Sequence, residues 1–235
     1  NAWRCNLMAT QLTWLGHGTW LIDSGGHKIL LDPFLNDNPA SPKKADEVDT
    51  NFILVSHGHF DHIADAASIA KRCNAKVLAI FEIAQWLANE HGVPDTVGIN
   101  IGGGIDMPFG RVTMTHAIHS SQLPDGTYGG NPGGFVIAFP EGNVYFACDT
   151  AVFSDMQLIG KQGINLAVLP IGDLFTMGVD DSIAATNLIN PGRVAPAHFN
   201  TWPPIEQDAT AWAERITEET EASPVVIEPG GLITL

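Results

Sequence analysis

The chain has 235 residues, of which 45% are hydrophobic and 16% are charged, and this composition favours a folded globular protein over a disordered one. Its formal net charge is −15, and its 11 lysines and arginines form no basic stretch longer than two residues, so nucleic acid is not an expected partner. Three cysteines without a short pairing spacing argue against a disulfide framework or a thiolate zinc site. No apolar run approaches membrane-spanning length, so we expect a cytoplasmic protein with no membrane partner.

Short apolar segments separated by glycines begin the chain. Residues 11–15, 19–22 and 28–31 are predicted to be strands of an antiparallel meander, because glycines stand between them. A polar, proline-containing loop is expected from residue 32 to about residue 49. Residues 1–7 are interpreted as an upstream extension or an expression remnant, because the chain from Met8 resembles a natural start.

From residue 52 onward, predicted strands alternate with predicted helices. Strands are expected at residues 52–55, 76–80, within 98–119, and at 134–139, 144–147, 165–169, 193–197 and 225–227. Helices are expected just after residue 62 and at residues 81–90, 182–189 and 209–217. Strand meanders interleaved with helices, and candidate ligands drawn from both halves, favour a single domain over residues 8–235 with two sheets flanked by helices.

Residues 57–62, with the sequence HGHFDH, place four strong metal-binding side chains directly after the predicted strand 52–55. On a continuing strand, His57 and His59 would share one face, while Asp61 and His62 would point to opposite faces. The chain must therefore turn here, which Gly58 permits. The alternatives are an accidental cluster on a solvated loop, or Asp61 acting only as a helix cap.

Three more candidate ligands lie at the ends of predicted strands, namely His119, Asp149 and His198. Imidazole and carboxylate groups suit zinc, iron or manganese. Seven such ligands exceed what one tetrahedral ion needs, but they suit two ions that share a carboxylate. Taken alone, Asp149 reads as a turn residue and His198 as a strand-end histidine. His116 competes with His119, because the two would face opposite sides of a straight strand.

The order HxHxDH, His, Asp, His resembles the signature of the metallo-beta-lactamase superfamily. Residues 13–22, 29–34, 128–135 and 170–173 resemble, more narrowly, its branch of uncharacterised metal-dependent hydrolases, which is related to the ascorbate-6-phosphate lactonases. This resemblance covers residues 8–235. It implies a four-layer αββα sandwich, in which two mixed β-sheets are flanked by helices and the metals lie at one edge of the paired sheets.

The resemblance also implies roles for the seven ligands. The first ion would be held by His57, His59 and His119, the second by Asp61, His62 and His198, with Asp149 bridging the two. Two divalent ions are implied, zinc first, with manganese, iron or nickel as alternatives. Asp61 and Asp149 are the candidate catalytic residues, because Asp61 would orient the nucleophile and Asp149 would hold the distance between the ions. Cys148 stands where the family usually has glycine, and it is expected to point into the sheet.

Several other residues are further candidates for the site, and some of them have two interpretations. Asp32 either ends a strand or accepts the N–H of a ligand histidine, and the resemblance favours the second reading. His17 either lines the cleft or forms a turn, and Asp173 is expected near the metals. The glycine-rich loop 120–134 is either a lid that contacts substrate through Tyr128 or a rigid crossover. Residues 202–204 are a second candidate rim of the cleft.

The predicted chemistry is hydrolysis of a small ester, lactone or phosphoester by a hydroxide that bridges or is bound to the two ions. Neither a GxSxG elbow nor a Cys–His pairing competes with this reading. A di-iron redox protein of the same superfamily is one alternative, although such proteins usually need a flavin module. A phosphodiesterase or nuclease is disfavoured by the acidity of the chain, and a non-catalytic metal-binding protein is a further alternative. Oligomeric state stays open, with a homo-oligomer as one option.

Overall fold

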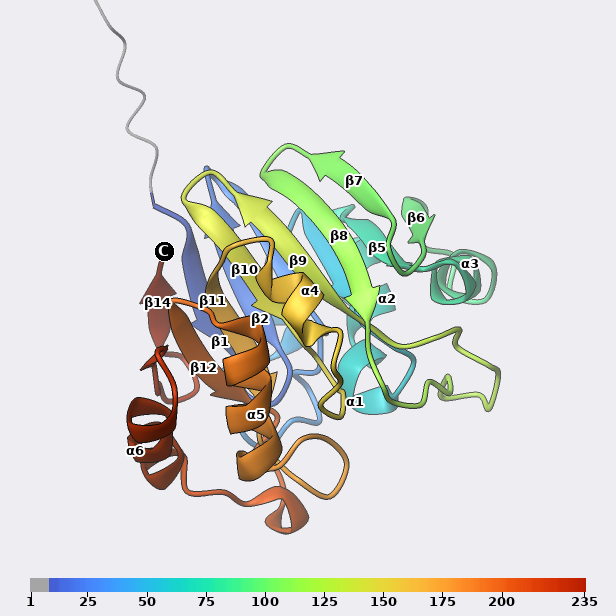
Figure 1. Cartoon of the computed structure of the whole chain (residues 1–235). Coiled ribbons are helices and arrows are strands. Elements are labelled where there is room, and N and C mark those ends of the chain that lie inside the picture. The colour runs from blue at the N-terminus through green and yellow to red at the C-terminus, as the bar shows by residue number, and fades with distance from the viewer. Residues whose placement is uncertain (1–8) are drawn as a thin grey trace, which may run out of the picture.

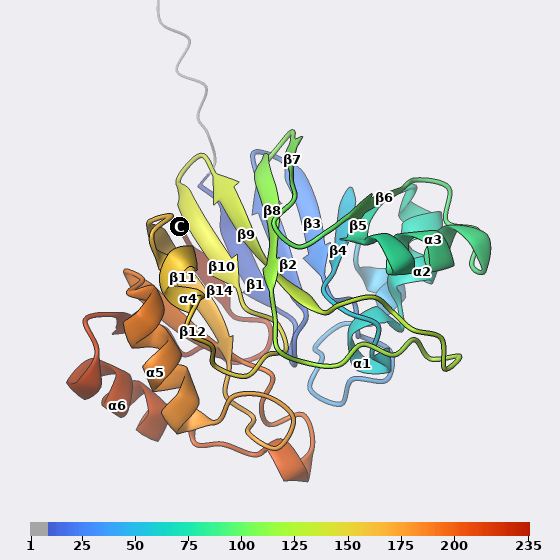
Figure 2. The ribbon, with the colours of Figure 1, turned by 45° about the vertical axis from the view of Figure 1, so that its right-hand side comes forward.

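The computed structural model describes residues 9–235, so the interpretation of residues 1–7 lies outside the described residues. Two seven-stranded sheets pack face to face, and helices cover their outer faces (Figure 1). The turned view in Figure 2 shows α2 and α3 against one sheet, with α4, α5 and α6 against the other. The expected αββα sandwich of two mixed sheets is confirmed.

The first sheet has the strand order β14-β1-β2-β3-β4-β5-β6. Its strands are β1 (Gln11–Trp14), β2 (Trp20–Ser24), β3 (His27–Leu31), β4 (Phe52–Val55), β5 (Lys76–Ile80), β6 (Thr96–Ile99) and β14 (Leu232–Thr234). The predicted antiparallel meander β1–β3 is confirmed, and β3 to β6 run parallel. The intervening helices are η1 (Ala45–Glu47), α1 (Phe60–Ile63), α2 (Ala66–Cys73) and α3 (Phe81–Asn89).

The second sheet has the order β13-β12-β11-β10-β9-β8-β7. Its strands are β7 (Gly104–Met107), β8 (Gly110–His116), β9 (Gly133–Phe139), β10 (Gly142–Phe146), β11 (Ile164–Pro170), β12 (Arg193–Ala197) and β13 (Ser223–Pro224). Strands β7 to β10 are antiparallel neighbours, and β10 to β13 are parallel. The helices of this half are α4 (Met156–Gly160), α5 (Val179–Ile189), η2 (Pro203–Ile205) and α6 (Ala209–Glu219).

Two predicted elements differ from the structure, and one helix was not predicted. The terminal strand predicted at residues 225–227 was wrong, because the last strand is β14, which pairs with β1. The strand in this region is β13, which lies just before residues 225–227 and pairs with β12, and the N–H of Val225 donates to the carbonyl of Val194 at 2.8 Å. Helix α1 begins at Phe60 and not after His62, so two candidate ligands lie on its first turn. Helix α4 was not predicted.

The core lies between the two sheets, where buried side chains of both meet. Strands β9 and β11 are buried along nearly their whole length, as expected for strands that are covered on both faces. The ring centroids of Trp20 on β2 and Phe146 on β10 lie 6.1 Å apart, across the interface of the sheets. Within residues 9–235, no helix has the length and apolar character needed to cross a membrane.

The packing of α6 on α5 provides a test of the fold. Trp212 is fully buried, and its indole Nε1 donates a hydrogen bond to the Ser182 hydroxyl at 2.9 Å. Trp212→Ala should therefore lower the free energy of unfolding by about 3–5 kcal/mol in denaturant titration. Glu218→Ala, at an exposed position of the same helix, should change it by less than about 0.5 kcal/mol. Equal effects of the two substitutions would contradict this packing.

Candidate metal centre

The turn after β4 brings the HGHFDH residues together. A Cβ at Gly58 would lie 3.2 Å from backbone atoms of Gln122 and Leu123, so the close approach of these two loops needs a glycine. His59 has extended backbone angles (φ −67°, ψ 147°) at the N-terminus of α1. The change from strand to helix within four residues turns the side chains toward a common point. Asp61 makes no capping hydrogen bond to α1, so its reading as only a helix cap was wrong.

The first ligand group consists of three histidines from two loops. Nδ1 of His59 lies 3.0 Å from Nε2 of His57 and 3.2 Å from Nε2 of His119. These three side chains form a cluster in which ligand atoms lie within 4.8 Å of one another. His116 is exposed at the end of β8, with its ring 5.4 Å from that of Phe153. The structure therefore places His119 in the cluster and His116 outside it.

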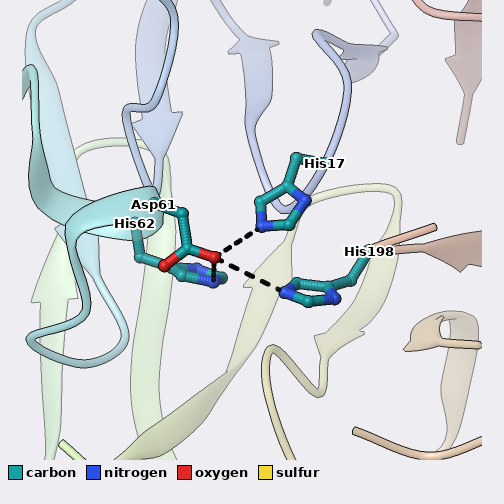
Figure 3. Close-up of side chains that lie close together, drawn as sticks. All are labelled: His17, Asp61, His62 and His198. Carbon is teal, nitrogen blue, oxygen red and sulfur yellow. Dashed lines mark hydrogen bonds and ion pairs between the residues drawn. The ribbon is translucent and has the colours of Figure 1, made fainter. Parts of the chain in front are cut away.

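The second ligand group gathers around the carboxylate of Asp61 (Figure 3). Asp61 Oδ2 lies 3.8 Å from Nε2 of His62 and 3.9 Å from Nε2 of His198. A fourth member, His17, is bonded to the same oxygen through Nε2 at 2.9 Å. His198 has a left-handed backbone (φ 53°), so the chain bends sharply after β12 and its imidazole turns toward α1.

Asp149 lies between the two groups. Its Oδ2 is 3.1 Å from Nε2 of His198 and 3.3 Å from Nε2 of His62, which belong to the second group. The same oxygen is 3.5 Å from Nε2 of His119 and 3.9 Å from Nε2 of His57, which belong to the first. One carboxylate oxygen thus contacts both groups, which is the arrangement needed for a bridging ligand.

Cys148 explains how Asp149 comes to face the cluster. Its backbone is left-handed (φ 53°), a conformation that costs little for glycine and more for cysteine. The thiol lies 3.7 Å from the carbonyl oxygen of Phe146 and lines a small cavity with Trp20. Cys148 therefore points between the sheets, as expected.

Several buried ligand atoms have no hydrogen-bond partner among residues 9–235. These atoms are Nε2 of His62, Nδ1 and Nε2 of His198, and Oδ1 of Asp149. Buried polar atoms are nearly always paired, and imidazole and carboxylate are the donors that divalent transition ions prefer. The cluster therefore fits metal ions, which would satisfy the lone pairs that face its centre.

Asp32 fixes the tautomers of two ligand histidines. Its Oδ2 accepts a hydrogen bond from Nδ1 of His62 at 2.9 Å, which leaves Nε2 of that ring with a lone pair. Oδ2 also accepts from the Ser56 hydroxyl at 2.6 Å, so the Ser56 oxygen accepts from Nδ1 of His57 at 2.9 Å. One carboxylate thus directs the lone pairs of both rings toward the cluster, and the reading of Asp32 as a mere strand-ending residue was incomplete.

Burial and the charges of neighbouring side chains set the protonation of the candidate ligands. Burial, together with the nearby His62, holds the pKa of His57 well below its usual range. Burial also lowers the pKa of His62, but Asp149 and Asp61 outweigh it and raise this pKa well above its usual range. Burial would raise the pKa of Asp149, yet His198 and His62 hold it well below its usual range. A metal ion that binds here must therefore displace a proton from His62.

His17 is the site residue that the ligand motif does not include. It forms a left-handed turn (φ 55°), which confirms that reading, and it is fully buried in the ligand cluster and is not among the described residues that line the cleft. Burial and the neighbouring His198 lower the pKa of His17 to about 3, so its ring is neutral. A Cβ at Gly18 would lie 2.9 Å from Cε1 of His62. The glycine after His17 is therefore a signal of close packing at the site.

Some of the remaining predicted site residues line the cleft, and others do not. Asp173 is exposed in a turn, where its N–H donates to the carbonyl of Met177 at 3.0 Å, and among the described residues it does not line the cleft, so its expected place near the metals stays a prediction. In the loop 120–134 only Ser120 lines the cleft over residues 9–235. Tyr128 is 63% exposed and bonds to Asn131, which favours the rigid crossover over the lid. The predicted rim at residues 202–204 is confirmed.

Comparison with known proteins agrees with the fold and the cluster. Residues 27–199 match the family model described as the beta-lactamase superfamily domain. The chain is 44% identical to a UPF0173 metal-dependent hydrolase of Heliobacterium modesticaldum, over 96% of this chain and 97% of that protein. It is 42% identical to one of Thermus thermophilus, over 96% and 99% of the two chains. Igni18, a metallo hydrolase of Ignicoccus hospitalis, superposes with a TM-score of 0.88 at 34% identity, covering 97% of this chain and 99% of its own. The chain therefore belongs to the beta-lactamase superfamily, in its group of metal-dependent hydrolases.

The tautomer control by Asp32 is testable. Asp32→Asn keeps the size of the side chain, and asparagine tolerates the left-handed backbone of this position (φ 45°). The amide cannot accept both hydrogen bonds as a carboxylate does, so we expect metal affinity to fall about 10–100-fold in a chelator competition assay. Asp23→Asn, on β2 away from the cluster, is the matched control. Unchanged affinity in Asp32→Asn would show that the tautomers are fixed in another way.

Proposed function

We propose that this protein hydrolyses a small ester, lactone or phosphoester at a centre of two divalent metal ions. The observation that carries the proposal is the position of Asp149, whose single oxygen Oδ2 lies 3.1–3.9 Å from histidine nitrogens of both groups. A protein with one ion would need only one of these groups. A cytoplasmic location, a small-molecule substrate and the absence of nucleic-acid and membrane partners stay predictions.

The seven motif residues divide between the two proposed ions. The first ion would be held by His57, His59 and His119, and the second by Asp61, His62 and His198, with Asp149 shared. Zinc is the leading candidate, with manganese, iron or nickel as alternatives. When bound, such ions supply Lewis acidity toward a carbonyl or phosphoryl oxygen and lower the pKa of water.

Asp61 is the protein group best placed to handle a proton at this centre. Burial would raise the pKa of Asp61, but the nearby His62 and the hydrogen bond from His17 outweigh it and hold this pKa below its usual range, so Asp61 is a carboxylate at neutral pH. A carboxylate only accepts, so Nε2 of His17 carries the hydrogen toward Asp61 Oδ2, and its Nδ1 accepts from the Thr201 hydroxyl at 2.8 Å. Asp61 lines the cleft, and these hydrogen bonds through His17 and Thr201 hold its carboxylate in one orientation. In this orientation it can position an attacking water and accept a proton from it.

Removing the shared carboxylate tests the two-ion centre. Asp149→Ala should lose bound metal, measured by elemental analysis, and should lower turnover at least about 100-fold, since even residues one step removed from a metal cost 10–100-fold. Asp173→Asn, at an exposed position outside the cluster, should retain both. Retention of metal and turnover in Asp149→Ala would contradict the bridging role.

Metal affinity should depend on pH with a defined sign. His62, with its raised pKa, must lose its proton before Nε2 can bind an ion, so lowering the pH favours the metal-free form. We expect the zinc affinity to fall as the pH is lowered from about pH 8 to pH 6, by at most about tenfold for each unit of pH, measured by competition with a chelator of known affinity. An affinity that does not change over this range would show that no ligand proton is displaced.

A further inference from the structure

The cleft over the ligand cluster is lined by polar and by apolar residues. Its volume is about 490 Å³, and the candidate ligands form part of its lining. The apolar part of the lining, called the apolar wall, consists of Phe60, Phe175, Trp202, Pro204 and Ile205. A substrate whose reacting bond lies at the ligands must therefore place another part of its structure against this apolar wall.

The aromatic part of this wall is held in place before any substrate binds. The Trp202 ring lies 5.0 Å from that of His17 and 6.0 Å from that of Phe34. Phe60, in turn, packs against Phe34 at 5.8 Å and against Trp202 at 6.2 Å. Contacts with the site residue His17 thus connect the wall to the ligand cluster. Because these side chains are already ordered, substrate binding loses little of their conformational entropy.

Two phenylalanines of the wall are more than half exposed. Phe60 is 55% exposed and Phe175 is 56% exposed. Phe175 lies in the loop between β11 and α5, whose base is anchored by the N–H of Met177 to the carbonyl of Thr150 at 3.0 Å. Apolar surface beside a polar site is typical of a ligand pocket, because a ligand that covers it removes it from water.

The cleft offers nothing to pair with a negative group on the substrate away from the ligands. Among residues 9–235, no lysine or arginine lines it. Outside the candidate ligands, its polar lining residue is Ser120, whose hydroxyl lies 3.3 Å from Nε2 of His59. The formal net charge of −15 adds a general repulsion of anions. A phosphate or carboxylate against the wall would lose its hydration without a charged partner.

We infer that the substrate is a neutral ester or lactone whose non-reacting part is an uncharged alkyl or aryl group seated against Phe175 and Trp202. This inference rests on the proposed function, because it places the cleaved bond at the ligand cluster. Hydrolysis adds one water: its oxygen bonds to the acyl carbon, the acyl–oxygen bond breaks, and the alcohol oxygen takes up a proton. Substrates with a phosphate or carboxylate on the distal part are excluded by the chemistry of the wall.

A matched set of three esters tests this class. With the full chain loaded with zinc, we compare kcat/KM for 4-nitrophenyl acetate, 4-nitrophenyl hexanoate and mono-4-nitrophenyl adipate, which has the hexanoyl chain length but ends in a carboxylate. Burial of one methylene contributes about fourfold, so the hexanoate should exceed the acetate at least about tenfold. The adipate should be at least about tenfold poorer than the hexanoate. A flat series, or a preference for the adipate, would overturn the inference and leave ester hydrolysis in place.

Two phenylalanines of equal exposure provide the matched variants. Phe175→Ala should remove most of the preference for hexanoate over acetate, mainly through a higher KM for the hexanoate. Phe81 is also 56% exposed, but it lies on α3 away from the cleft, so Phe81→Ala should keep the preference. Equal behaviour of the two variants would contradict a role for the wall.

Binding of a neutral apolar probe provides a readout that does not need turnover. N-phenyl-1-naphthylamine should fluoresce on binding to the wild type, and its Kd should rise several-fold in Phe175→Ala but not in Phe81→Ala. If no ester is hydrolysed while this difference is found, the proposed ester hydrolysis fails and the apolar subsite stands. If the probe binds both variants and the wild type equally, the apolar subsite fails.

Discussion

Lone pairs of buried histidine nitrogens and carboxylate oxygens meet at one edge of this protein without hydrogen-bond donors to satisfy them. Asp149 Oδ2 lies 3.1–3.9 Å from four imidazole nitrogens, and Nε2 of His62 and of His198 have no hydrogen-bond partner among the described residues. Leaving such groups buried and unpaired is costly, so cations at its centre would stabilise the arrangement. The fold can be understood as the means of holding these groups together.

The convergence of these side chains requires strained backbone conformations at the ends of the strands. Asp32, Cys148 and His198 follow β3, β10 and β12, and each has a left-handed backbone, as does His17 in the loop before β2. Left-handed non-glycine residues cost about 1–3 kcal/mol each, and they persist only where surrounding structure enforces them. The left-handed residue bends the chain after each strand. This bend turns its own side chain, or the side chain of the next residue, toward the ligand cluster. Strain and function therefore coincide at this edge of the sheets.

Local signals in the sequence predicted two sheets flanked by helices, and the resemblance to the superfamily implied the αββα sandwich and the full set of candidate ligands. The motif at residues 57–62 needs only a turn, and His119, Asp149 and His198 follow apolar runs that read as strands. The sequence predicted His17 and Asp32 only as alternatives, since their roles depend on contacts with Asp61 and His62 that lie 44 and 30 residues away. The left-handed turn at Cys148 was not predicted, because cysteine carries no turn signal.

Anomalous X-ray scattering from crystals of the protein grown with zinc tests the central claim most directly. The account predicts two ions, one bound by His57, His59 and His119 and the other by Asp61, His62 and His198, with the Asp149 carboxylate contacting both. A single ion, or ions bound away from Asp149, would contradict it.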